Sequence, residues 1–144
     1  MENVIRAREA LHRVLSEIGW TAGANTPDST YRVDLGPPHV PVSDVVVGID
    51  REAQLLVFLA NFHPAAPAAN RDGVARWINR INWDLMLGNF EMHEDRGAVR
   101  FRSSVDFGGG ELAEGTIRRT ILTAMEIVEA HADGISGAMA GRGQ

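Results

Sequence analysis

The stretch RWINRINWDLMLGNFEMHEDRGAVRFRSSVDF, residues 76–107, decides the fold because a helical pattern changes within it to a strand pattern. Before Gly88, apolar residues recur at three- and four-residue steps, as they do on one face of a helix. After Gly88, apolar and polar residues alternate, as they do along a half-buried strand. The stretch therefore predicts a helix from Asn70 to about Met86, a left-handed glycine at position 88 that ends it, and a β-hairpin.

The number of residues in the hairpin loop fixes which residues pair across the two strands. With an even loop, Phe90 pairs with Phe101 on one face and Glu91 pairs with Arg100 on the other, so apolar and charged pairs are separated. An odd loop would place the apolar Met92 opposite Arg100. We therefore predict the even loop.

The predicted helix has apolar residues on two faces. On a helical wheel, one stripe suits a core and comprises Val74, Trp77, Ile78, Ile81 and Leu85. Trp83 lies roughly opposite this stripe, whereas a helix that packs on a sheet needs only one apolar face. Aromatic residues and Met are enriched at protein interfaces. We therefore predict an interface with a second copy or a partner protein at Ala75, Asn79, Trp83 and Met86.

The flanking segments add two helices and three strands. Residues 2–18 have the spacing of one helical face, and residues 31–35 alternate like a half-buried strand. Residues 42–50 and 53–62 are near-continuous apolar runs, which are typical of strands in the middle of a sheet with both faces covered. A last helix is predicted to open at the glycines 108–110.

The predicted order of elements is α-β-β-β-α-β-β-α, which indicates an α+β fold. The last helix is expected to fray after about residue 133, because Gly134 and Gly137 lower its helix propensity. We therefore predict one domain over residues 1–136 and a disordered tail over residues 137–144.

Composition excludes several kinds of chemistry. The chain contains no Cys, and all 14 basic residues are Arg, so it has no Lys either. Thiol nucleophiles, Cys-based metal sites, Schiff-base chemistry and the P-loop lysine are therefore impossible. A net charge of −5 argues against broad nucleic-acid binding. The chain also lacks an apolar run long enough for a membrane span or a signal peptide, so we expect a cytoplasmic protein.

Three motifs have a functional and a plainer interpretation. Gly108–Gly110 could cradle a phosphate, but the phosphate-binding fingerprints are missing and Glu111 and Glu114 would repel an anion. The five histidines show no metal-ligand spacing. Arg100 and Arg102 share one strand face and could bind RNA, although Glu91 can neutralise one of them. We therefore expect a plain turn, no metal or cofactor, and a salt-bridged sheet face.

The paired asparagines Asn79 and Asn82, the turn at Gly88, Asn89 and Phe90, and the hairpin after it resemble the YbjN family of bacterial sensory transduction regulators. The resemblance implies a fold similar to that of type III secretion chaperones, with helices packed on a twisted antiparallel sheet, and usually a dimer. The second helix commonly contributes to the dimer contact in those relatives. The family brings no catalytic residue or cofactor. We expect Asn82 to satisfy backbone groups at the end of the helix rather than to bind a ligand.

These observations favour a non-enzymatic regulator or chaperone-like adaptor that acts as a homodimer and binds a partner protein. The alternative is a small-molecule or nucleotide sensor with a ligand between the helices and the sheet, near the glycines 108–110.

Overall fold

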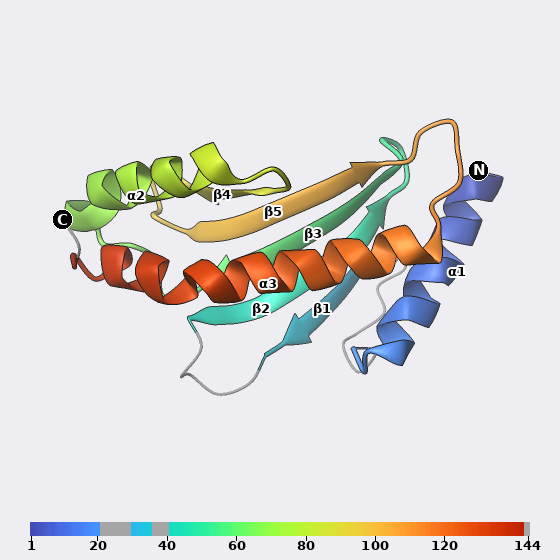
Figure 1. The fold of residues 1–144 in the computed structure, drawn as a ribbon, viewed down its shortest axis with the longest axis horizontal. Helices are drawn as coiled ribbons and strands as arrows, with labels where there is room; N and C mark the ends of the chain where they lie inside the picture. The colour runs from blue at the N-terminus through green and yellow to red at the C-terminus, as the bar shows by residue number, and fades with distance from the viewer. Residues whose placement is uncertain (21–29, 36–40, 143–144) are drawn as a thin grey trace.

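The structure is a computed structural model that describes residues 1–20, 30–35 and 41–142. Within these ranges the chain forms three α-helices and one five-stranded sheet (Figure 1). The elements in chain order are α1 (Glu2–Glu17), β1 (Thr30–Asp34), β2 (Val42–Asp50), β3 (Leu55–Phe62), a short 3-10 helix η1 (Ala68–Asn70), α2 (Arg71–Asp84), β4 (Asn89–Met92), β5 (Val99–Asp106) and α3 (Glu114–Met139). The predicted α+β class and order of helices and strands are confirmed.

The sheet is antiparallel throughout, with strand order β1-β2-β3-β5-β4. Hairpins join β2 to β3 and β4 to β5. In the strand order, β2 and β3, the two strands predicted from apolar runs, both lie away from the edges of the sheet. Phe90 pairs with Phe101 and Glu91 with Arg100, so the even-loop register is confirmed.

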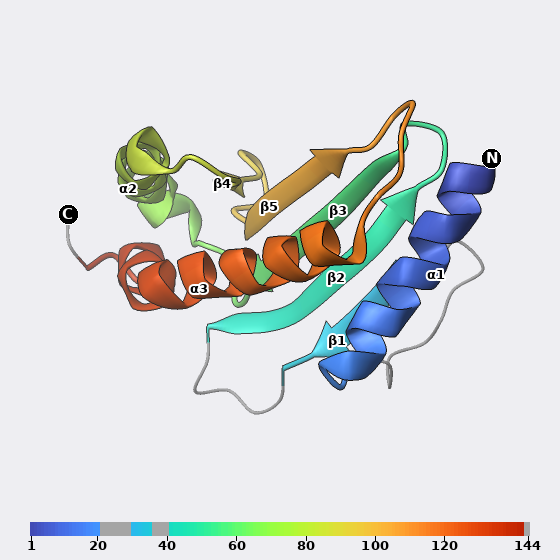
Figure 2. The ribbon, with the colours of Figure 1, turned by 45° about the vertical axis from the view of Figure 1, so that its right-hand side comes forward.

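The helices gather on one face of the sheet (Figures 1 and 2). Helix α3 runs along this face over β3 and β5, and α1 crosses near the beginning of α3 and contacts β2. Helix α2 packs beside α3 and over β4. The layers therefore form a single core between the sheet and the helices.

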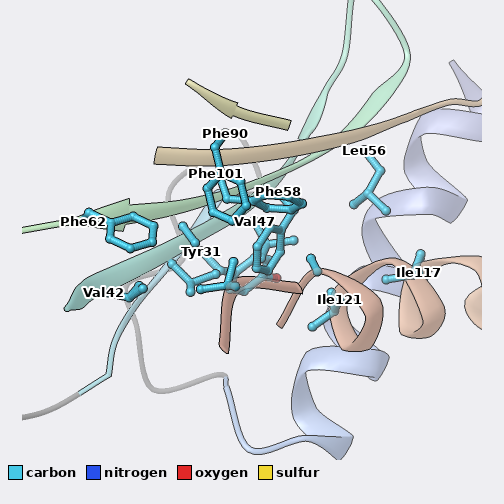
Figure 3. Close-up of a cluster of buried hydrophobic side chains, with 14 of the residues drawn as sticks. Tyr31, Val42, Val47, Leu56, Phe58, Phe62, Phe90, Phe101, Ile117 and Ile121 are labelled. Carbon is cyan, nitrogen blue, oxygen red and sulfur yellow. The ribbon is translucent and has the colours of Figure 1, made fainter. Parts of the chain in front are cut away.

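Aromatic rings occupy the centre of this core (Figure 3). Phe90 and Phe101 meet edge to face with ring centroids 5.0 Å apart, and Phe58 approaches Phe101 in the same manner at 6.4 Å. Ile117 and Ile121 of α3 cover the cluster from the helical side. Such edge-to-face pairs add about 0.5–1.5 kcal/mol each beyond the area that they bury.

The opposite face of the sheet differs from the prediction. We expected both faces of β2 and β3 to be covered, but no helix of the described residues lies on the far face. Val46, Val57 and Leu59 are only half-buried there. An apolar run in a strand cannot by itself distinguish a covered face from one that is sheltered only by neighbouring strands.

The end of α2 also differs from the prediction. The helix ends at Asp84, and Leu85 is already extended, with ψ at 129°. Gly88 has the expected positive φ, 72°, but it lies in the turn before β4 rather than at the helix terminus. A Cβ at this position would lie 2.3 Å from Cζ of Phe101. The turn therefore needs glycine, because its backbone passes directly against the buried Phe101 ring.

Helix α3 begins and ends later than predicted. It begins at Glu114 rather than at the glycines 108–110, and it continues to Met139 without fraying at residue 133. Ala138 and Met139 are buried, and Asn70 Nδ2 donates a hydrogen bond of 2.9 Å to the Met139 carbonyl. The predicted tail is therefore wrong for residues 137–139, because tertiary packing outweighs the low helix propensity of glycine.

Candidate functional site

Large apolar side chains protrude where α2 ends. Trp83 is 89% exposed, Met86 95% and Leu87 58%. Ala75 and Asn79, the other two predicted interface residues, are also exposed and lie further back along the helix. We call this surface the α2 patch, and it comprises Ala75, Asn79, Trp83, Met86 and Leu87. Large contiguous apolar patches are uncommon on monomeric proteins and are frequent at interaction sites.

Leu87 is the member of the α2 patch that sequence analysis missed. A helical wheel cannot place it, because it follows the end of the helix. The signal available in the sequence was the run of Leu85, Met86 and Leu87 directly before a glycine, which is longer than one helical stripe needs.

Asn82 holds the end of α2 against β4. Its Nδ2 donates to the Phe90 carbonyl, and the Phe90 amide donates to its Oδ1, each over 2.9 Å. Both backbone groups of Phe90 are thereby satisfied, although β4 is an edge strand. Asn89 is half-buried next to Phe90, and its side chain reaches Glu91 over 3.4 Å. Asn82 and Phe90 therefore join the end of α2 to β4, and Gly88 and Asn89 lie in the segment between them.

A groove between α2 and α3 lies beside the α2 patch. It has a volume of about 390 Å³. Its apolar walls come from Trp77, Ile81 and Leu85 on one side and from α3 on the other, and the exposed Arg80 and Asp84 border it. We call this cavity the α2–α3 groove, and its α3 lining comprises Ala130, His131 and Gly134.

Gly134 explains how closely the two helices approach. A Cβ on Gly134 would lie 3.0 Å from Cζ2 of Trp77, so a larger residue would push the indole away. The glycine that suggested a fraying helix is therefore a packing position. His131, on the same wall, places its ring edge-on against Phe90 with centroids 5.8 Å apart.

The arginines of β5 are paired across the strands. Glu91 accepts a hydrogen bond from Arg100 and forms an ion pair with Arg102 over 3.0 Å. Phe101 points to the opposite face and is buried. The predicted salt-bridged face is therefore present, and Glu91 pairs with both arginines rather than with one. A base could not stack on Phe101 alongside these arginines.

The other sequence motifs have structural roles. In the glycine turn, the Gly108 amide donates to Asp106 Oδ1 over 2.8 Å and the Gly110 amide donates to the Phe107 carbonyl over 3.0 Å. Within residues 1–20, 30–35 and 41–142, no three His, Asp or Glu side chains gather as metal ligands. Over the same residues, no helix is both long and apolar enough to cross a membrane.

Ionic contacts join α1 to the beginning of α3. Arg13 pairs with Glu114, and Arg118 pairs with Glu17 over 2.7 Å. These hydrogen bonds raise the pKa of both guanidinium groups. All four side chains are substantially exposed, so we attribute orientation rather than large stabilisation to them.

The fold is an α+β fold of the type III secretion chaperone kind, as the comparison with solved structures shows. The "ExsC-ExsE Complex" structure has a TM-score of 0.64 with 14% identity, covering 90% of this chain and 93% of that chain. The HopA1–SchA chaperone–effector complex has a TM-score of 0.62 with 10% identity, covering 92% and 98%. Identities this low show the fold alone.

The chain belongs to the YbjN family, whose description reads "Putative bacterial sensory transduction regulator", because the family profile matches residues 7–136. The crystal structure of YbjN from E. coli has a TM-score of 0.62 with 15% identity and covers 88% of this chain and 92% of that chain. No curated protein matches the chain. The predicted family and chaperone-like fold are confirmed.

Proposed function

We propose that this protein is a non-enzymatic, cytoplasmic, chaperone-like regulator that acts as a homodimer through the α2 patch and binds a partner protein. The observation that carries the proposal is the exposure of Trp83 and Met86, at 89% and 95%, on an ordered helix end. Similar folds were solved as complexes of two proteins, one of them described as a chaperone with its effector. This likeness supports protein binding as the activity.

The α2 patch carries enough apolar area for association. A buried Trp removes about 150–250 Å² from water, which is worth about 4–6 kcal/mol at ~25 cal/mol per Å². A two-fold interface buries two copies of the patch, so the two Trp83 side chains contribute about 10 kcal/mol before Met86 and Leu87 are considered. This is comparable to the about 4–15 kcal/mol that association costs in lost freedom.

The oligomeric part of the proposal is tested by Trp83→Glu. A charge at this position should give soluble, folded monomer, because it would be buried without a partner in the dimer. Light scattering after size exclusion measures the mass in solution. The matched control is Leu122→Glu, because Leu122 of α3 is 50% exposed and lies outside the α2 patch. A dimer that survives Trp83→Glu would overturn this interface.

The partner part of the proposal is tested by crosslinked capture of the tagged protein from its host, with mass spectrometry of what accompanies it. The helix-free face of the sheet is the surface that we expect the partner to use, because Val46, Val57 and Leu59 are apolar and half-buried there. We expect one recurrent, stoichiometric partner with the wild type and its loss with Val57→Arg. If the Val57→Arg variant captures the same partner as the wild type, this face is not the binding surface.

The alternative of a small-molecule or nucleotide sensor near Gly108–Gly110 has less support. The Gly108 and Gly110 amides are already bonded within the turn, so they are not directed at a ligand. A sensor would show a thermal shift with one class of metabolite, because a ligand that binds only the native state raises its apparent stability.

A further inference from the structure

Three apolar side chains of the α2–α3 groove are only half-buried. Trp77, Ile81 and Leu85 line the groove from α2, where this helix packs beside α3 (Figure 1). Gly134 lets the Trp77 indole lie close to α3, and the part of the indole that stays accessible lines the groove. An apolar group that entered the groove would remove more of these side chains from water. The groove therefore favours a ligand with an apolar body.

The border of the groove carries one charge of each sign. Arg80 and Asp84 are both exposed, and within the described part of the chain neither forms an ion pair. Residues four apart are neighbours on a helix surface, but a basic residue placed before an acidic one is the weaker order for a local pair. Both charges are therefore available to a ligand.

The end of α2 strengthens the preference for a cation near Asp84. This residue is the last of the helix, and the last turn contains no basic residue. The carbonyl groups at a helix C-terminus carry about half a negative charge, which adds to that of the carboxylate. An ammonium group would be stabilised by both. The guanidinium of Arg80, one turn earlier, is suited to a carboxylate.

We infer that the α2–α3 groove binds a free α-amino acid with a bulky apolar side chain. Its carboxylate pairs with Arg80, its ammonium group lies at Asp84, and its side chain packs against Trp77 and Ile81. A free amino acid carries both charges on one carbon, so it can satisfy two neighbouring side chains at once. An apolar carboxylate would be repelled by Asp84, and an apolar amine would be repelled by Arg80.

The size of the groove agrees with a single amino acid. Its volume of about 390 Å³ lies near the lower end of the about 300–1,000 Å³ that is usual for small-molecule sites. None of the lining residues belongs to the α2 patch, so the inference goes beyond the proposed function and does not depend on a dimer.

The fluorescence of Trp77 tests binding directly. The chain has three Trp residues, so a variant with Trp20→Phe and Trp83→Phe leaves the indole of the groove as the only one. L-leucine and L-phenylalanine should each change its emission saturably, and calorimetric titration of the unaltered protein should give the same dissociation constants. Glycine should bind at least about tenfold more weakly, because it has no side chain to bury. No saturable change up to about 20 mM of either apolar amino acid would overturn the site.

Ligand analogues test the two charges separately. Leucinamide lacks the carboxylate and 4-methylpentanoate lacks the ammonium group, so each should bind about fivefold more weakly than L-leucine. Arg80→Gln should weaken L-leucine about fivefold without weakening leucinamide, and Asp84→Asn should weaken L-leucine without weakening 4-methylpentanoate. The matched control is Arg119→Gln, which removes an exposed arginine of α3 outside the groove and should change nothing. If Arg80→Gln weakens L-leucine and leucinamide equally, the carboxylate does not lie at Arg80 and the inference is wrong.

Obstruction tests the groove without changing its charges. Ala130→Trp should fill the groove from the exposed surface of α3 and weaken L-leucine at least about a hundredfold in calorimetric titration. Leu122→Trp, on the same helix but outside the groove, is the control and should bind as the wild type does. Circular dichroism checks that both variants fold. Binding of L-leucine to folded Ala130→Trp with wild-type affinity would place the site elsewhere and overturn the inference.

Discussion

The two ends of the helical layer differ in how fully one chain covers its own apolar surface. At the α1 end, most of the apolar face of α1 is buried, with Leu11, Val14 and Leu15 completely inaccessible, and ionic contacts join α1 to α3. At the α2 end, α2 packs on α3 but leaves Trp83 and Met86 in solvent. Apart from Met1 and Ile5, the α1 end buries its large apolar side chains within the chain, whereas the α2 end leaves Trp83, Met86 and Leu87 exposed.

The exposed side chains at the α2 end are not a sign of loose packing, because the backbone there is held by specific contacts. Asn82 makes two hydrogen bonds to Phe90, Gly88 allows the turn to lie against Phe101, and Gly134 brings Trp77 against α3. These contacts hold the backbone at the end of α2 against β4 and α3. The proposed interface would benefit, because preorganisation lowers the entropic cost of binding.

The largest effect separates the two ends directly. Leu11→Ala should lower the free energy of unfolding by about 2–5 kcal/mol, because Leu11 is fully buried and leaves a cavity. Trp83→Ala should change that free energy by less than about 0.5 kcal/mol in the monomer. Urea denaturation at a protein concentration too low for association measures both. A loss above about 2 kcal/mol for Trp83→Ala would show that its indole packs on its own chain.

Two glycines have similar backbone angles but different surroundings, so alanine substitutions at the two positions compare how tightly each turn is packed. Gly88 has φ at 72° near α2, and Gly109 has φ at 77° in the turn before α3. Alanine costs about 1–2 kcal/mol of backbone strain at either position. Only at Gly88 would the new Cβ meet Phe101, so Gly88→Ala should cost about 2 kcal/mol more than Gly109→Ala. Equal losses in thermal unfolding would show that the turn at Gly88 can move.

Local patterns in the sequence were sufficient for the order of the elements and the pairing of β4 with β5. The register followed from parity, because a shift of one residue would bury Arg100 and expose Phe90. The exposure of Trp83 followed from its place on the wheel of α2. These features depend on residues that are close in sequence, within one or two helical turns or across one hairpin. The periodicity of apolar residues is sufficient to predict such local features.

The features that sequence analysis missed depend on residues far apart in the chain. The end of α3 is fixed by burial of Met139 and by its hydrogen bond from Asn70, so glycine content alone misplaced it. The α2–α3 groove forms because Gly134 accommodates Trp77, and no local pattern pairs these two positions. The single-sided covering of the sheet was missed because half-buried and buried apolar strands look alike in sequence.

The paired asparagines give a smaller, more local contrast. Asn82→Ala should lower the free energy of unfolding by about 2 kcal/mol, because it removes two hydrogen bonds and leaves the backbone groups of Phe90 without a partner. Asn79→Ala should change it by less than about 0.5 kcal/mol, because Asn79 is exposed on the same helix. Urea denaturation of dilute protein measures both variants. Similar losses for the two would show that the joint between α2 and β4 does not depend on Asn82.

The smallest effect concerns the ionic contacts at the α1 end. Arg118→Gln removes the pair with Glu17 and should lower the unfolding temperature slightly at low salt, with no difference in about 1 M NaCl, because salt screens exposed pairs.

The contribution of Arg118 to stability has a defined pH dependence. Since the hydrogen bond to Glu17 raises the pKa of Arg118, this stabilisation is complete below the ordinary pKa of arginine and is lost only as strongly alkaline pH passes the raised value. The arginine should therefore contribute no slope to stability near neutral pH. If the difference between variant and wild type persists in high salt, the aliphatic stem of Arg118 packs on α1. The α1 end would then be held by apolar contact even where charges mark its surface.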